Sequence, residues 1–477
     1  MTLLQRRQFS FVTFVFQIIF AVLYAYYVRY DHSHMPHGNG SEIYVNTDYP
    51  MFQDIHVMVV VGFGFLMSFL KKYGFSAISI NLLLTSFIMQ YVIILRGFLS
   101  QEFVTTGKFT ISINELIQAD LSCVAVLITM GVLLGRLTPI QFLILGFIEV
   151  SISTILEHVL FNVLHINDGG RSLVIHCFGA YFGLTVAKVN ERRTIVELDS
   201  EDGNLEHSEL FSMIGTLFLW IFFPSFNGAT QVTEDARYRA IMNTYLAMGS
   251  CTLVAFMLSS MSDQLGRFNM LHIQSSTLSG GVAVATVANV ILYPHHAIIV
   301  GAIAAFISVL GHVWVTPKIL ERKCQLYDTC GVHNLHGLPS LLSGFLSVYF
   351  VLHYDPAEYA ENLFTIYPYW KGGPREGADR DAVEQAIFQL LGIVLTLFVS
   401  ILGGALTGYV INFSLLSKVK TELPRFEDAN FYTNAKFSVL GRPVTLQPDP
   451  PIYNPLVQTA RVDLTAGMKF EHEMSYF

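Results

Sequence analysis

Charged residues are scarce in this chain. Only 13% of its 477 residues are Asp, Glu, Lys or Arg, whereas 52% are hydrophobic and the mean hydropathy is +0.49. A soluble protein of this length needs a larger share of charged side chains to cover its surface. The composition therefore argues against a soluble protein and predicts an all-α chain that crosses a membrane many times.

Cysteines, basic stretches and nucleotide-binding loops are few or missing. The five cysteines suggest no disulfide framework, so we expect free thiols. The net charge of −8 comes without a basic stripe, which argues against a nucleic-acid partner. No GxxxxGK(S/T) loop is present to suggest coupling to ATP. We predict no enzymatic activity, no catalytic residues and no cofactor.

A short histidine cluster is the one metal-binding pattern in the sequence. It consists of His32, His34 and His37. Imidazoles bind transition metals, but this cluster is isolated in a polar stretch. A solvated loop explains it better, so we expect no metal site.

Twelve apolar segments are long enough to cross the hydrocarbon core, which needs about 20 residues. The first follows Arg6 and Arg7 but is too long for the apolar part of a signal peptide, so we expect it to remain as an anchor. The segments run over residues 9–28, 55–70, 75–96, 115–135, 139–164, 168–187, 210–226, 239–261, 268–292, 297–315, 331–352 and 383–413.

Lysines and arginines gather in alternate loops, on the same side as Arg6 and Arg7. This distribution predicts that both termini are cytoplasmic. The loops at 31–54 and 355–381 then face outward. Asn39, followed by Gly and Ser, lies in the first of them and is a candidate glycosylation site.

An Asp and a His recur with the same spacing. Asp168 precedes His176 by eight residues, and Asp328 precedes His336 by eight, 160 residues further on. The two units enter the membrane from opposite sides, which is the pattern of an inverted repeat. Eight helical residues rise about 12 Å, so each histidine reaches the region of the midplane. Ionisable residues at that depth usually mark a permeation path.

Simpler explanations exist for single members of this set. An isolated intramembrane histidine, such as His272 or His312, is more often satisfied by a neighbouring helix than functional. Asp168 and Asp328 are expected to cap their helices rather than to touch the solute. The repeated histidine pair is harder to explain in this way.

Burial disfavours a charged imidazolium, so the two histidines should be neutral. One ring can then donate a hydrogen bond to the other, while the remaining nitrogens face the path. Such a path favours a small uncharged molecule that forms hydrogen bonds, or a cation that leaves its proton at the mouth.

A series of motifs is spread over nearly the whole chain. The motifs are QDIHVMVVVGFGFLM (53–67), RLTPIQ (136–141), HCFGAYFGLTV (176–186), GTLFLW and PSFN (215–227), HIQSSTLSGGVAV (272–284), DTCGVHNLHGLP (328–339) and FEDANFY (426–432). Together they resemble the Rh branch of the ammonium transporter (Amt/MEP/Rh) superfamily. The resemblance implies a homotrimer in which each subunit has its own pore, formed by an inverted five-helix repeat, an extra N-terminal helix and a C-terminal helix.

The resemblance also implies a division of the chain. Residues 1–30 would form the N-terminal transmembrane helix and residues 31–54 an extracellular loop. Residues 55–417 would form the ammonia channel domain and residues 418–477 a cytoplasmic tail.

The same resemblance implies roles for particular residues. His176 and His336 match the twin pore histidines, Asp168 an outer acidic position needed for conduction, and Asp328 its inner counterpart. Glu157 matches a vestibule carboxylate that gathers cations.

The outer gate departs from the family pattern. Phe226 matches one ring of a stacked aromatic gate, although ordinary packing explains most phenylalanines. Leu121 stands where the second ring is expected. Because leucine has no π-face for a cation, the outer mouth should recognise ammonium less well.

The function implied is passive conduction of neutral ammonia through the histidine pair, in the plasma membrane. Ammonium would be collected outside and lose a proton before entry. Two alternatives stay open, an electrogenic ammonium transporter and a non-conducting structural or sensor protein. Whether carbon dioxide or methylammonium also passes is open as well.

Overall fold

The computed structural model describes residues 3–31, 48–70, 72–190, 206–412, 428, 431 and 432. All of them belong to one compact unit, Met1–Ala435. The candidate glycosylation site Asn39, the histidines at 32, 34 and 37, and almost all of the predicted tail lie outside the described residues.

Helices make up most of the described chain, as expected from the composition. The α-helices are Leu3–Tyr27 (α1), Tyr49–Val57 (α2), Phe63–Leu66 (α3), Gly74–Phe98 (α4), Gln101–Thr106 (α5), Ile113–Leu133 (α6), Pro139–His158 (α7), Phe178–Asn190 (α8), Glu206–Gly228 (α10), Glu234–Ser262 (α11), Ser279–Ala285 (α12), Pro294–Leu310 (α13), Leu338–His353 (α14), Leu363–Ile366 (α15) and Ala382–Ile411 (α16).

Turns of π-helix or 3₁₀-helix extend or interrupt several of these helices. The π-helical turns are Met58–Gly62 (η2), Val159–Val163 (η4), Ser172–Cys177 (η5), His272–Ser276 (η6), Gly311–Glu321 (η7) and His333–Gly337 (η8), and the 3₁₀ turns are Met67–Phe69 (η3) and Pro356–Asn362 (η9). Single π-turns of this kind are frequent at functional sites.

Sequence signals at the helix starts agree with the observed boundaries. Ser112 and Glu115 form a capping box at the start of α6, and Thr138 and Gln141 form another at the start of α7. Such boxes satisfy backbone amides that have no partner within the helix. Pro139 follows in the first helical position, where its missing N–H costs nothing.

Within the described ranges, eleven helical stretches are long and apolar enough to cross a membrane. The remaining expected span, 268–292, is not one continuous helix, because η6 and the short α12 are followed by turns. The carbonyls of Ala285 and Thr286 instead accept hydrogen bonds from the amides of Gly170 and Gly169. An interrupted helix is tolerated at membrane depth when protein groups satisfy its backbone in this way.

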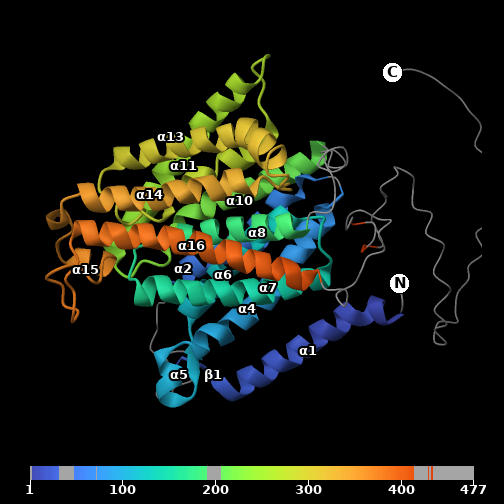
Figure 1. The fold of residues 1–477 in the computed structure, drawn as a ribbon, viewed down its shortest axis with the longest axis horizontal. Helices are drawn as coiled ribbons and strands as arrows, with labels where there is room; N and C mark the ends of the chain where they lie inside the picture. The colour runs from blue at the N-terminus through green and yellow to red at the C-terminus, as the bar shows by residue number, and fades with distance from the viewer. Residues whose placement is uncertain are drawn as a thin grey trace, which may run out of the picture. The chain divides into compact units, whose positions relative to one another are not determined.

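The long helices lie side by side (Figure 1), with α6 the most buried and α1 at the periphery. Phe16 and Phe20 of α1 contact Phe87 of α4, with ring centroids 5.1 and 5.3 Å apart. The amino-terminal end of α1 and the carboxyl end of α16 lie at one end of the bundle, and α5 and α15 at the other (Figure 1). That these two helix ends face the cytoplasm stays a prediction.

A two-stranded sheet departs from the purely helical expectation. Val28–Tyr30 (β1) pairs in parallel with Phe109–Ile111 (β2). Three-residue strands are too short to give an alternating pattern, so sequence periodicity could not reveal them. The sheet fixes the end of the peripheral helix α1 to the chain that leads into α6.

The described residues of the tail contact the start of α4, where Tyr432 packs against Phe75 and its hydroxyl contacts that of Ser79. The carboxylate of Asp428 accepts hydrogen bonds from the amides of Phe75 and Ser76 at the start of α4, at 2.7 and 2.9 Å. The Ser76 hydroxyl also donates to it, at 2.6 Å. Asp428 therefore caps α4 from more than 350 residues away in the sequence.

We predict that Gly179→Ala destabilises the helical bundle. A Cβ atom at Gly179 would lie 2.5 Å from the carbonyl oxygen of Ala125, so α8 would have to move away from α6. Overpacking of this kind costs about 1–3 kcal/mol. Gly249→Ala in α11 is the control, because no atom lies within 4 Å of its Cβ position. Thermal unfolding in detergent should show a lower midpoint for Gly179→Ala alone, and equal midpoints would contradict the packing argument.

Candidate permeation site

The two repeated histidines meet inside the bundle. Nδ1 of His176 in η5 lies 3.1 Å from Nδ1 of His336 in η8, and the rings are nearly parallel, at 8°. Both side chains are buried. A neutral imidazole has one donor and one acceptor nitrogen, so one ring donates to the other across this contact. The pair then presents one bare Nε2 and one Nε2–H, and Nε2 of His176 has no partner among the described atoms.

The two halves of the repeat share their backbone geometry. Each histidine lies in a π-turn that leads into an α-helix, α8 for His176 and α14 for His336. In each half the residue three positions after the aspartate has a positive φ, 66° at Arg171 and 69° at Gly331. The equal spacing seen in the sequence therefore corresponds to equal local structure.

The aspartates cap the starts of these two segments, as expected. Asp168 accepts hydrogen bonds from the amides of Leu173 and Val174, at 2.9 and 3.1 Å, and from the Thr286 hydroxyl, at 2.6 Å. Asp328 accepts from the amide of His333 at 2.7 Å. Burial raises the pKa of Asp328 to about 6, although nearby backbone amides and Arg136 act in the opposite direction.

Aromatic rings pack against both histidines. The ring centroid of His176 lies 5.9 Å from Phe223 and 5.7 Å from Phe226, and that of His336 lies 6.4 Å from Phe63. Phe226, the predicted gate ring, is fully buried and lies beside His176 of the pair. These rings shield the imidazoles from water and favour their neutral form.

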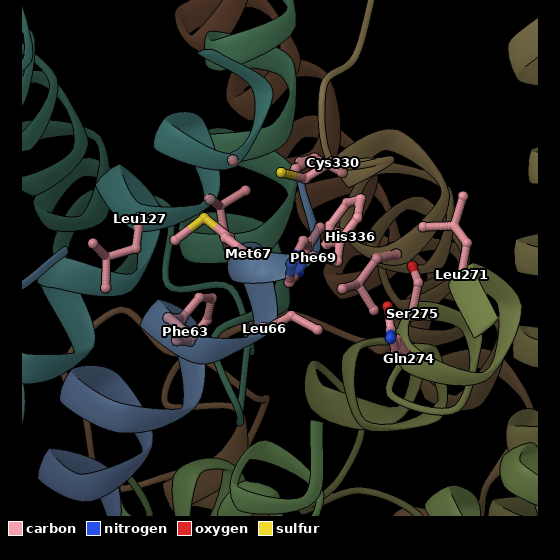
Figure 2. A pocket seen from close by; sticks show the side chains of 14 residues that line it. Phe63, Leu66, Met67, Phe69, Leu127, Leu271, Gln274, Ser275, Cys330 and His336 are labelled. Atoms are coloured by element: carbon pink, nitrogen blue, oxygen red, sulfur yellow. The ribbon is translucent and has the colours of Figure 1, made fainter. Parts of the chain in front are cut away.

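A cavity of about 30 Å³ adjoins His336. Figure 2 shows Phe63, Met67 and Leu127 on one side of it and Leu271, Gln274 and Ser275 on the other. This volume exceeds the roughly 10–15 Å³ that one water-sized molecule needs. The space beside the histidine pair thus admits a small molecule.

The predicted vestibule carboxylate is not free. Glu157 forms a two-pronged ion pair with Arg96, at 2.6 and 2.9 Å, and also contacts Arg171. The Gln118 side-chain oxygen accepts from both arginines at 3.2 Å. We expected Glu157 to gather cations from solution. Its carboxylate instead pairs with Arg96 and Arg171, two partners that we did not predict.

Two of the cavities at the expected outer mouth are lined by Glu157 together with another predicted site residue. The larger, of about 390 Å³, includes Glu157, Asn167 and Asp168 in its lining. The smaller, of about 10 Å³, includes Glu157 and Leu121. Leu121 is buried at the predicted gate position and brings no aromatic face to it.

Two other intramembrane histidines, His272 and His312, have ordinary polar neighbours. His272 lies 3.3 Å from the Ser259 hydroxyl, and His312 lies 3.2 Å from that of Ser275. Both contacts agree with satisfaction by neighbouring segments. Over the part of the chain that the structure describes, no group of three or more His, Cys, Asp or Glu side chains is arranged to hold a metal ion.

Comparison with known proteins identifies the family. A model of the Ammonium Transporter Family matches residues 10–431. The chain is 38% identical over 426 residues to Ammonium transporter Rh type B-B of Xenopus laevis, covering 87% of this chain and 91% of that one. The chain belongs to the ammonium transporter family. This family consists of membrane transporters and channels rather than enzymes.

Further relatives confirm the Rh branch and the fold. Ammonium transporter Rh type C of Homo sapiens is 36% identical over 454 residues, covering 92% of this chain and 91% of that one. The solved structure of Nitrosomonas europaea Rh50 superposes with a TM-score of 0.67 at 32% identity, over 81% of this chain and 92% of that chain. Mep2 of Saccharomyces cerevisiae, at 16% identity and a TM-score of 0.64 over 84% and 92% of the two chains, shares the fold.

Sequence reasoning missed several residues of this site. Arg96 lies at the end of an apolar run and Arg171 directly follows two glycines, so each was visible as a charge near a membrane span. Their convergence on Glu157 depends on the packing of α4, α7 and η5, which no local pattern encodes. Phe63 and Phe223 carried no signal that set them apart from the other phenylalanines.

We predict that Asp168→Ala destabilises the fold by about 1–3 kcal/mol, because three buried donors lose their acceptor. Asp168→Asn keeps one acceptor oxygen and should lose less. Glu376→Ala, which removes a carboxylate at an exposed turn position, is the control and should change the stability by less than about 0.5 kcal/mol. Thermal unfolding in detergent tests this order of stability among the variants. A midpoint equal to that of the wild type for Asp168→Ala would refute the capping role.

Proposed function

We propose that this protein is a passive Rh-type ammonia channel. Ammonia enters at the outer mouth, passes Phe226, His176 and His336 in single file, and is protonated again on the other side. Flow follows the concentration and pH gradients. The observation that carries the proposal is the 3.1 Å contact between Nδ1 of His176 and Nδ1 of His336, two buried imidazoles beside a cavity of about 30 Å³.

The chemistry of the pair suits this solute. Ammonia can accept a hydrogen bond from an N–H group and donate to a bare ring nitrogen, and the pair offers one of each. An ammonium ion would have to give up its hydration shell between rings that offer no counter-charge. That transfer costs several kcal/mol, so the neutral form passes more easily.

Assembly and location are part of the same proposal. We propose a homotrimer in the plasma membrane, with the ends of α1 and α16 that share one side of the bundle in the cytoplasm, as the family resemblance implies. Large apolar side chains of α11 and α16 are exposed in the single chain, including Leu253 (75%), Met257 (52%) and Ile387 (60%). Lipid or neighbouring subunits would cover such surfaces.

We predict that His176→Ala lowers ammonia flux about tenfold, because the solute loses a hydrogen bond worth roughly 1 kcal/mol and the partner ring loses its fixed orientation. Flux is measured by stopped-flow pH change in proteoliposomes under an ammonium gradient. His353→Ala is the matched control, since this histidine is exposed at the end of α14. Wild-type flux through His176→Ala at equal protein content would disprove the role of the pair.

A second measurement separates neutral from charged transport. Voltage clamp of the same protein under an ammonium gradient should show no current that scales with flux, because neutral ammonia carries no charge. A current proportional to ammonium would replace the proposal with electrogenic transport. Absence of both flux and current would favour a structural or sensor role.

A further inference from the structure

Arg171 occupies a backbone conformation that favours glycine. Its φ of 66° is in the left-handed region, where a side chain is disfavoured. The inverted repeat supplies an internal comparison, because the equivalent position after Asp328 is Gly331, with a φ of 69°. The fold thus requires the same backbone turn twice and carries an arginine in one copy. A non-glycine residue held in this region points to a function for its side chain.

The guanidinium group of Arg171 is directed at Glu157. It forms an ion pair with the Oε1 side of that carboxylate and lies 4.6 Å from the ring centroid of Phe161. Arg96 occupies both oxygens of Glu157 from the other side. Glu157 therefore has two guanidinium partners, and both of its carboxylate oxygens are engaged.

This cluster lies on the route into the protein. Arg171 lines both the cavity of about 390 Å³ and the smaller one that Leu121 also lines. The other carboxylate that lines the larger cavity, Asp168, is 4% exposed and accepts hydrogen bonds from three donors. A cation in the larger cavity thus meets two guanidinium groups and no free carboxylate.

We propose that Arg171 determines which form of the substrate the outer mouth accepts. By holding Glu157 in an ion pair, it prevents the carboxylate from collecting ammonium, so that the channel takes up ammonia directly from solution. Leu121 acts in the same direction, because it offers no aromatic face to a cation. This inference rests on the proposed ammonia channel and concerns only how its substrate enters.

The test compares inhibition of ammonia flux by methylammonium, a cation at neutral pH, in proteoliposomes of the full chain at one fixed pH. In the wild type, methylammonium should inhibit weakly. Arg171→Gly should lower the inhibitory concentration by roughly fivefold or more, because Glu157 gains a free face for a cation. Glycine accepts the positive φ, which offsets part of the stability lost with the ion pair, and Arg96 remains to pair with Glu157. Thermal unfolding in detergent verifies that the variant is folded before its flux is compared. Adding Glu157→Gln to Arg171→Gly should remove the gained inhibition.

Each outcome decides between specific alternatives. Equal inhibition of wild type and Arg171→Gly, or a gain that survives Glu157→Gln, would overturn the role of Arg171 while leaving ammonia conduction intact. Absence of ammonia flux in the wild type would instead overturn the channel itself. Arg96→Gln provides a second route, since it removes the other arginine without touching the strained turn, and should shift inhibition in the same direction.

Discussion

The hydrogen bond between His176 and His336 sets the main constraint on this structure. Two polar rings can stay neutral and paired inside the membrane only if the backbone that carries them is also satisfied. Asp168 and Asp328 accept hydrogen bonds from backbone amides at the starts of the two segments. The carbonyls of the interrupted segment around Ala285 accept hydrogen bonds from the amides of Gly169 and Gly170. The caps, the positive φ angles and the π-turns are thus parts of one arrangement that presents two imidazoles to each other.

The two halves of the inverted repeat share this arrangement and differ in the residue that has the positive φ. Both halves have an aspartate cap, a left-handed residue and a histidine in a π-turn. The outer half adds Arg171, with Glu157 as its partner, where the inner half has Gly331. The two mouths can therefore differ in charge while the centre stays nearly symmetric, because the mouths are built from residues that the central geometry does not restrict.

Much of the fold and part of the site could be predicted from the sequence, for identifiable reasons. The long apolar runs indicate the membrane spans. The equal spacing of Asp168 and His176 and of Asp328 and His336 indicates the repeat. The break after α12 could not be predicted, because its residues are as apolar as those of a continuous helix and its cause lies in contacts with Gly169. The ion pairs of Glu157 could not be predicted from the sequence either, because Arg96 and Arg171 approach Glu157 from separate segments.

The packing around the imidazoles also bears on proton leakage. A proton that hops along the pair leaves both rings in the opposite tautomer, and a second hop in the same direction requires the rings to turn over. Phe63, Phe223 and Phe226 pack against these rings, and dense packing opposes such a turn. A path open to a small neutral molecule can in this way remain closed to a continuous stream of protons, so that the membrane keeps its proton gradient.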